Sequence, residues 1–238
     1  MDIKLHYALM LLSLALFTSA CSQEGKDAKS KSQASSTPTP VVEIVKVDPA
    51  LAAAGKILYN QNCSVCHQPD AIGKPGFAPS LTNQEFLRAA SDTFILGTVR
   101  DGRQGTGMPP FAHLGRKDIE SIVAFLRSHA TEANVSEKIN AQPHTEGDPR
   151  LGQVWFEQIC STCHGPQGDG YIAGGTGTAI GKVGFLSKAS DGFIRETIKH
   201  GRTNTRMLGF TGPSAIAALT DKEIDDIIAY LRTVPSKS

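Results

Sequence analysis

The chain has 238 residues, enough for one large domain or two small ones, and its formal net charge is +1, from 24 Lys and Arg against 23 Asp and Glu. No basic run or stripe accompanies this balance, so the sequence excludes a nucleic-acid-binding protein. Aromatic residues make up only 6% of the chain, and two small domains would each have a thin hydrophobic core.

The chain begins with the pattern of an export signal. The apolar run from Tyr7 to Phe17 is too short to cross a bilayer, and small residues separate it from Cys21. Small residues that end in a cysteine resemble a bacterial lipobox, so we predict a signal peptide over 1–20 and lipidation of Cys21. The alternative is ordinary cleavage before Cys21, which would leave a free thiol in an oxidising compartment. We expect a periplasmic protein, held at the membrane by its lipid and without a transmembrane helix.

Two long stretches of the chain repeat one another. The segment GKILYNQNCSVCH at 55–67 aligns with GQVWFEQICSTCH at 152–164, at an offset of 97 positions. The segment SDTFILGTVRDGRQGTGMPPF at 91–111 aligns with SDGFIRETIKHGRTNTRMLGF at 190–210, at an offset of 99. The offset grows because the second copy has small insertions between its motifs.

The repeats define the predicted domain organisation. Residues 21–50 are rich in Ser, Lys, Thr and Pro and are expected to form a flexible linker behind the lipid anchor. The first copy of the domain is predicted over 51–130 and the second over 150–238. The polar segment 131–149 between them contains Pro and Gly and is expected to be an interdomain linker.

Each copy has the hydrophobic periodicity of helices and almost no strand signals. Apolar residues recur at i, i+3, i+4 and i+7 near the end of each copy, at Ile119, Ile122, Val123 and Leu126 and at Ile224, Ile227, Ile228 and Leu231. Near the start, Gly55 and Tyr59 fall on one helical face, where Gly permits another helix to approach, and the second copy has the same pair. The predicted fold is therefore all-α.

The motifs CSVCH and CSTCH have the spacing C-x-x-C-H, which is typical of c-type haem attachment. Two cysteines three positions apart on a helical turn reach the two vinyl groups of one porphyrin, and the adjacent His then lies under the ring. We predict thioether bonds from Cys63, Cys66, Cys160 and Cys163, and iron ligation by His67 and His164. Four of the five cysteines then hold two haem c groups, and Cys21 remains for the lipid.

Two other uses of paired cysteines are disfavoured. A structural zinc site needs a second pair of ligands in the same domain, and neither copy has one. A thioredoxin-like dithiol needs a βαβ context, whereas these repeats are helical.

The sixth iron ligand is predicted from the methionines. Beyond the first twenty residues the chain has two, Met108 and Met207, which lie 41 residues after His67 and 43 after His164. Each could simply fill core space, but that would not place them at equivalent points of the two copies. A thioether ligand blocks the open position that a substrate needs, and it raises the reduction potential relative to a second imidazole.

Each copy resembles a class I cytochrome c domain, and the chain is similar to dihaem cytochromes c of the bacterial periplasm. The resemblance rests on the N-terminal helix with its Gly, the C-x-x-C-H motif, the Met loop and a C-terminal helix with an aromatic residue. It implies two tandem domains, each wrapped around one covalent haem. In each, the two terminal helices cross, and His and Met bind the iron from opposite faces.

The resemblance also implies a proline carbonyl that accepts a hydrogen bond from the iron-bound His. Pro79, in GFAPSL, fits this role for His67, but GTGTAIGKVGF in the second copy offers no evident equivalent for His164. Two loop arginines, Arg103 and Arg202, could either pair with haem propionates or be exposed.

The remaining histidines have weaker claims on iron. His113 and His200 lie near the methionines, but neither has a counterpart in the other copy, so both are expected on the surface. His129 and His144 lie at a helix end and in the linker, and they are expected to be solvated.

These features favour an electron carrier over an enzyme. Two haems with both axial positions filled would pass single electrons between redox partner proteins. An electron-transfer subunit of a respiratory or dehydrogenase complex has the same chemistry with a permanent partner. A dihaem peroxidase or oxidase would need an iron with an open position, which two methionine ligands do not leave.

Overall fold

The computed structural model describes residues 47–213 and 215–237. The predicted signal peptide, Cys21 and nearly all of the predicted linker 21–50 lie outside the described residues. Both repeats fall within one compact unit, Val41–Ser238.

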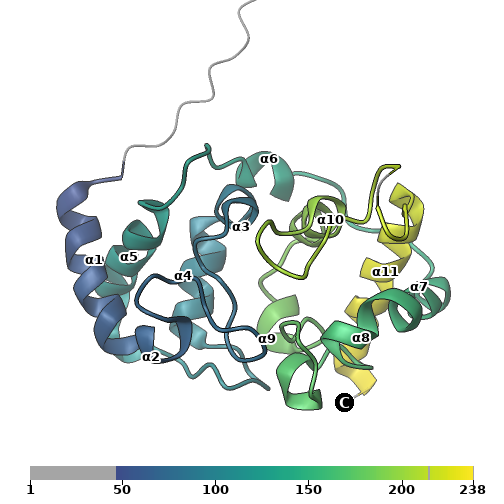
Figure 1. Ribbon diagram of the computed structural model, residues 1–238, viewed down its shortest axis with the longest axis horizontal. Helices are drawn as coiled ribbons and strands as arrows, with labels where there is room; N and C mark the ends of the chain where they lie inside the picture. Colours follow the sequence, from purple (N-terminus) through teal and green to yellow (C-terminus); the bar gives the residue numbers. More distant parts are fainter. Residues whose placement is uncertain (1–46, 214, 238) are drawn as a thin grey trace, which may run out of the picture. The chain divides into compact units, whose positions relative to one another are not determined.

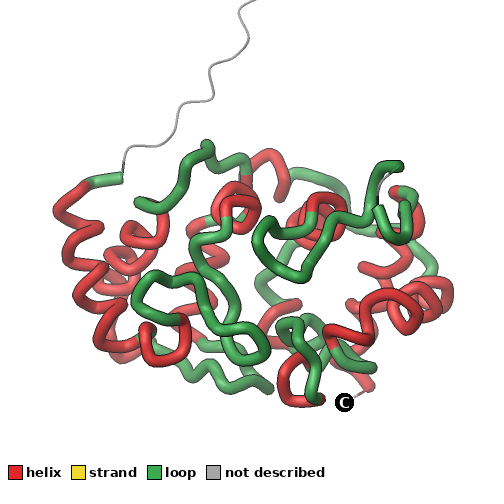
Figure 2. Tube along the Cα trace, in the orientation of Figure 1, coloured by secondary structure: helices red, strands yellow, loops and turns green. Residues whose placement is uncertain are grey.

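The described part of the chain consists of helices and loops, with no strand, in agreement with the all-α prediction (Figure 2). The first repeat contains α1 (Pro49–Asn62), α2 (Ser64–His67), α3 (Gln84–Ala89), α4 (Asp92–Asp101), η1 (Ala112–Leu114) and α5 (Gly115–Arg127) (Figure 1). The second contains α7 (Pro149–Trp155), the π-helical turn η2 (Phe156–Cys160), α8 (Ser161–His164), η3 (Gly170–Ala173), α9 (Val183–Leu186), α10 (Asp191–His200), α11 (Asp221–Thr233) and η4 (Val234–Lys237). Helix α6 (Ser136–Asn140) lies between the repeats. No helix in the described ranges is long and apolar enough to cross a bilayer.

Short side chains begin the equivalent helices of the two repeats in the same way. Ser91 and Ser190 precede α4 and α10, and each hydroxyl accepts a hydrogen bond at 3.0 Å from the amide of the third residue after it. Asp48 and Asp148 precede α1 and α7 and accept from the first-turn amides, followed in both cases by a proline that needs no amide partner. These local signals are in the sequence, which explains why the helix starts repeat so closely.

The first and last helices of each repeat pack directly against each other, α1 on α5 and α7 on α11. A Cβ atom on Gly55 would overlap the backbone carbonyl of Ser121, and one on Gly152 would overlap that of Asp226. An aromatic pair lies beside each crossing, with ring centroids 5.0 Å apart in the first repeat and 5.3 Å apart in the second. The expected role of the two glycines in close helix approach is confirmed.

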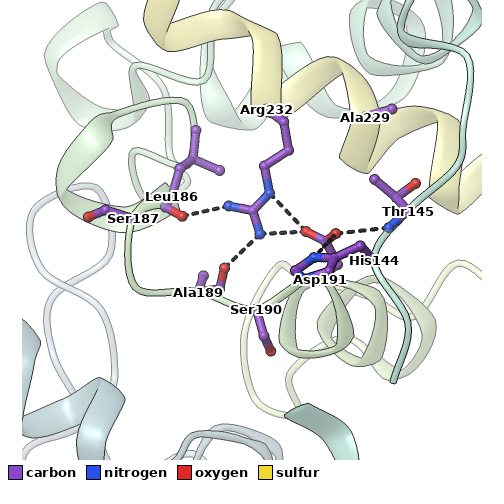
Figure 3. Close-up of a pocket in the computed structure, with 9 residues that line it drawn as sticks. All are labelled: His144, Thr145, Leu186, Ser187, Ala189, Ser190, Asp191, Ala229 and Arg232. Atoms are coloured by element: carbon purple, nitrogen blue, oxygen red, sulfur yellow. Dashed lines mark hydrogen bonds and ion pairs between the residues drawn. The ribbon is translucent and has the colours of Figure 1, made fainter. Parts of the chain in front are cut away.

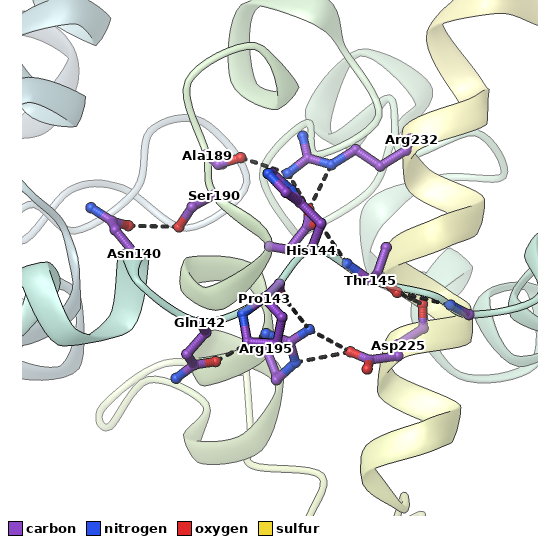
Figure 4. Close-up of polar contacts among 12 residues, drawn as sticks. Asn140, Gln142, Pro143, His144, Thr145, Ala189, Ser190, Arg195, Asp225 and Arg232 are labelled. Carbon is purple, nitrogen blue, oxygen red and sulfur yellow. Dashed lines mark hydrogen bonds and ion pairs between the residues drawn. The ribbon is translucent and has the colours of Figure 1, made fainter.

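The segment predicted as an interdomain linker is fastened to the second repeat. The hydroxyl of Ser190 donates to the amide oxygen of Asn140 at 2.6 Å, and the guanidinium of Arg195 donates to Gln142 at 2.9 Å (Figure 4). The buried side chain of Ile139 adds an apolar contact from α6. This stretch is therefore ordered against α10 rather than free in solvent.

Four phenylalanines, Phe86 and Phe94 from the first repeat and Phe185 and Phe193 from the second, join the repeats. Phe94 and Phe193 occupy equivalent positions, and their ring centroids lie 4.9 Å apart. The cross contacts match as well, since Phe86 lies 6.4 Å from Phe193 and Phe94 lies 6.2 Å from Phe185. Equivalent residues thus contact one another reciprocally, as in an isologous dimer.

Candidate haem sites

The C-x-x-C-H motifs each form one helical turn. In the first repeat, Cys63 caps α2 and its carbonyl accepts from the amides of Cys66, at 3.2 Å, and His67, at 2.9 Å. In the second, Cys160 stands in the same way before α8. Cys63, Cys66, Cys160 and Cys163 are free of disulfides and partly exposed. Each motif therefore presents two thiols and an imidazole from one turn of backbone.

The environment of these thiols does not favour a reactive dithiol. Burial, with a smaller effect from the neighbouring cysteine of each motif, raises the pKa of Cys63 to about 11 and that of Cys160 to about 12. A redox-active cysteine needs a lowered pKa, because the thiolate is the attacking species. The argument against a thioredoxin-like pair thus rests on chemistry as well as on fold.

His67 is held in one orientation. Its Nδ1 lies 3.0 Å from the carbonyl oxygen of Pro79, the contact that the family resemblance implied. Burial lowers the pKa of His67, so the ring is neutral, and because a carbonyl only accepts, Nδ1 carries the proton. The lone pair is then on Nε2, which is the atom available to a metal.

His164 is held in the same way, by a residue that the sequence analysis did not find. Its Nδ1 lies 2.7 Å from the carbonyl oxygen of Thr178. Burial lowers the pKa of this ring too. Thr178 stands 99 positions after Pro79, the offset of the following aligned segment, so extending that alignment backwards could have found it. A search for a second proline missed Thr178, because the hydrogen-bond acceptor is a backbone carbonyl and not a side chain.

The two methionine loops share one conformation. Gly102 and Gly201 begin them with φ of 67° and 66°, in the region that favours glycine, and a Cβ on either would crowd the backbone after the methionine. The amide of the residue after each glycine donates to the methionine carbonyl, at 3.0 Å for Met108 and 2.7 Å for Met207. Both methionine side chains are partly buried against the hydrophobic core.

Two threonines, Thr106 and Thr205, brace these loops and were missed from sequence. The hydroxyl of Thr106 donates to the carbonyl of Arg103 at 2.7 Å and accepts from the Met108 amide at 3.2 Å. Thr205 makes the same pair of bonds, at 2.7 and 3.0 Å. The signal was present as the shared pattern Gly-Arg-x-x-Thr-x-Met.

The other histidines divide differently from the prediction. His113 and His200 are exposed as expected, and His144 is 99% exposed. The prediction for His129 was wrong. Its Nε2 is buried and has no hydrogen-bond partner among the described residues, and the ring stands edge-on to Phe125 with centroids 5.0 Å apart. Periodicity predicts that the helix ends near this point, which suggested a solvated ring, but the ring packs against Phe125.

A surface pocket on the second repeat lies apart from these residues. Its lining comprises His144, Thr145, Leu186, Ser187, Ala189, Ser190, Asp191, Ala229 and Arg232 (Figure 3). The carboxylate of Asp191 accepts from the Arg232 guanidinium at 2.8 Å and from the Thr145 amide at 2.9 Å. None of the predicted haem residues lines it, and each of its polar side chains has a hydrogen-bond partner in the protein.

The two repeats match different family models, both for haem proteins. Residues 50–126 match the family described as cytochrome c oxidase, cbb3-type, subunit III, and residues 150–235 match the family described as cytochrome c. Each match includes one C-x-x-C-H turn and one methionine loop. This chain is a dihaem cytochrome c of class I. It has two haem c groups, one for each repeat.

The curated relatives of this cytochrome include subunits of an oxidase. The cbb3-type cytochrome c oxidase subunit CcoP of Rubrivivax gelatinosus is 29% identical over 82% of this chain and 59% of its own length. The corresponding subunit FixP of Bradyrhizobium diazoefficiens is 28% identical over 74% of this chain and 62% of its own length. The chain thus spans about three fifths of the relatives that it matches.

The chain's own residues fit the haem groups. Each repeat offers paired thiols, a neutral imidazole with its metal-binding nitrogen free, and a methionine on a braced loop. This donor set of nitrogen and sulfur suits haem iron with two strong axial ligands.

Proposed function

We propose that this cytochrome transfers single electrons between redox partner proteins, with both haems ligated by His and Met. Cys63, Cys66, Cys160 and Cys163 hold the porphyrins, and His67 with Met108 and His164 with Met207 supply the axial ligands. The observation that carries the proposal is the duplication of the whole methionine loop, including its glycine and its bracing threonine. When bound, each haem iron takes up and gives up one electron.

The protein's part in this function is to hold the ligands still. The carbonyls of Pro79 and Thr178 hold the protons on Nδ1 and point each imidazole. The threonine hydroxyls accept from the methionine amides and so hold the backbone of both loops. Fixed ligands lessen the rearrangement between oxidation states, which suits electron transfer.

A second candidate is a permanent subunit of a respiratory complex. The similarity to cbb3-type oxidase subunits over 82% of the chain favours it. The chemistry at the haems is the same in both cases, and co-purification of an oxidase from solubilised membranes would distinguish them.

We further propose that the mature chain begins at a lipidated Cys21 and works at the periplasmic face of a membrane. The lipobox-like sequence before Cys21 supports this, and the Ser- and Lys-rich segment after it provides reach. Metabolic labelling with a fatty acid, lost in Cys21→Ser, would test it. Labelling that persists in Cys21→Ser would contradict the proposal.

An optical and EPR redox titration of the intact holoprotein tests the assignment of an electron carrier. The expected result is two low-spin haems and a methionine–iron charge-transfer band whose intensity accounts for both. A high-spin haem that binds cyanide or CO in the isolated protein would instead indicate an open iron and favour a peroxidase or oxidase.

A further inference from the structure

Arg103 and Arg202 occupy equivalent places in the two methionine loops, and both side chains cross the boundary between the repeats. The guanidinium of Arg103 lies 4.9 Å from the ring centroid of Phe185, in the second repeat. The guanidinium of Arg202 lies 5.1 Å from that of Phe86, in the first. Phe86 and Phe185 are themselves equivalent, so the two repeats exchange these arginines reciprocally.

The side chain of Arg103 reaches the haem site of the other repeat. Its Nη2 donates to the carbonyl of Ala179 at 2.6 Å. Ala179 follows Thr178, whose carbonyl orients His164. The side chain of Arg103 is therefore bonded to the segment of the second repeat that holds His164.

The second arginine is anchored across the boundary by its neighbour. The amide and the hydroxyl of Thr203 both donate to the carboxylate of Glu85 at 3.1 Å, and the Asn83 amide donates to the Thr203 carbonyl at 3.0 Å. These bonds fix the loop of the second repeat on α3 of the first. The position of Arg202 over Phe86 is thus set by several contacts.

The two guanidiniums have little negative charge around them. Burial lowers the pKa of both to about 10, and for Arg103 the charge of Arg202 contributes to this lowering. The hydrogen bond of Arg103 goes to a neutral carbonyl, and the Arg202 guanidinium donates none to any residue within 47–213 or 215–237. Glu85 is the carboxylate that acts on Arg202, and the Tyr171 phenol lies near both. Two adjacent, partly buried cations require more counter-charge than this.

Haem c supplies such counter-charge, since each group carries two carboxylates. We propose that Arg103 and Arg202 form one cationic site, shared by the two repeats, that binds haem carboxylates and makes the reduction potential of each haem depend on an arginine of the other repeat. This inference rests on the proposed function, because it assumes a haem in each repeat. Planar guanidiniums suit the site, since they pair with carboxylates through two bonds and stack on aromatic rings.

A purely structural role would have different consequences. If the arginines only stack on Phe86 and Phe185 to hold the repeats together, their removal lowers stability and leaves the potentials unchanged. If each serves only its own repeat, removal shifts one haem. The shared site alone predicts a shift at the haem of the opposite repeat.

The test is a redox titration of the holoprotein that resolves the two haems, performed on Arg103→Gln. The haem of the second repeat is identified in parallel as the one whose methionine–iron band disappears in Met207→Ala. Loss of a nearby cation destabilises the reduced state, so the potentials of both haems are expected to fall. Arg103→Lys, which keeps the charge, is expected to shift them less. The control is Arg116→Gln, which removes an exposed charge outside both methionine loops and is expected to change neither potential.

Several outcomes decide the proposal. A shift confined to the first-repeat haem, or no shift at either haem, would overturn it. If Arg103→Gln does not fold, Arg202→Gln makes the reciprocal test, and a shift confined to the second-repeat haem would then overturn it. In either case an intact low-spin spectrum in the unaltered protein leaves the proposed function standing, whereas a high-spin spectrum there would contradict that function itself.

Discussion

The two repeats present the same haem-binding geometry with different side chains. The first holds its proximal imidazole on a proline carbonyl and the second on a threonine carbonyl, at 3.0 and 2.7 Å. The aromatic pair beside the helix crossing is exchanged, Tyr59 with Phe125 in one repeat and Phe156 with Tyr230 in the other. What both repeats keep is therefore the position of an acceptor, a ring or a bend rather than the residue that provides it.

An arginine–aspartate pair shows where the repeats differ physically. In the first, Arg127 donates to Asp92, which is 69% exposed. In the second, Arg232 donates to Asp191, which is 4% exposed and also receives the Thr145 amide from the fastened linker. The carboxylate of the pair is therefore exposed in the first repeat and buried in the second, where the linker contacts it. The arginine–aspartate pair of the second repeat is therefore expected to stabilise the fold more than the pair of the first.

The largest expected effect is loss of an axial ligand. Met207→Ala should abolish the methionine–iron band of the second haem, lower its potential and leave it covalently attached through Cys160 and Cys163. Met108→Ala should do the same to the first haem alone. Optical titration measures both. If either variant keeps the full band and the original potential, the ligand assignment for that repeat is wrong.

The ion pair with the buried carboxylate should contribute more to the stability of the fold than the pair with the exposed carboxylate. Asp191→Asn is expected to destabilise by about 3 kcal/mol, because it breaks an ion pair whose carboxylate is buried and also accepts from the Thr145 amide. Asp92→Asn should cost less than about 1 kcal/mol, because that carboxylate is solvated. Denaturant unfolding of the holoprotein measures both. Equal losses in the two variants would show that the linker does not distinguish the pairs.

The same comparison has a pH dependence. Burial alone would raise the pKa of Asp191, but hydrogen bonds from the Thr145 amide and Arg232 outweigh it and hold that pKa below its ordinary value of 3.8. A lowered folded-state pKa stabilises the fold above the unfolded value, and this contribution is lost as the pH falls through the folded one. The stability gap between the unaltered protein and Asp191→Asn should therefore narrow below a pH of about 4. A gap that stays constant to lower pH would contradict the assigned direction.

The loop threonines should have a smaller and equal effect. Thr106→Val and Thr205→Val each remove a hydroxyl that both donates and accepts within its methionine loop. Each should cost about 1 kcal/mol and speed the replacement of methionine by added imidazole at its own haem. Stopped-flow mixing with imidazole measures the rate. Thr211→Val, which removes a hydroxyl bonded elsewhere to the carbonyl of Lys199, is the control and should leave the rate unchanged.

The smallest expected effect is at the acceptor for the second histidine. Thr178→Ala keeps the backbone carbonyl that accepts the hydrogen bond from His164 Nδ1, so the spectrum and potential of the second haem should not change. Pro79→Ala should behave likewise at the first haem if its chain conformation persists. A clear change in Thr178→Ala would mean that its side chain, and not its carbonyl, positions the imidazole.

The sequence by itself determined the helical fold and the cofactor, and it predicts the ligands. These features are local, since one helical turn brings two cysteines and a histidine together, and a glycine, a threonine and a methionine define a loop within seven residues. The duplication strengthened the prediction of the methionine ligands, because a loop does not recur at equivalent positions of two repeats by chance. The terminal helices followed from periodicity, and in the structure Asp48 and Asp148 cap the first helix of each repeat.

Only the tertiary structure decided the features that depend on distant parts of the chain. The side chain of Thr178 gave no sign that its carbonyl accepts a hydrogen bond from His164, since every residue has a backbone carbonyl and only the alignment with Pro79 points to this one. The Nε2 atom of His129 is buried because the ring stands against Phe125, and the segment 131–149 is ordered because of contacts with α10. The sequence places Arg103 and Arg202 in loops. Only the packing of one repeat on the other brings each guanidinium over a phenylalanine ring of the other repeat.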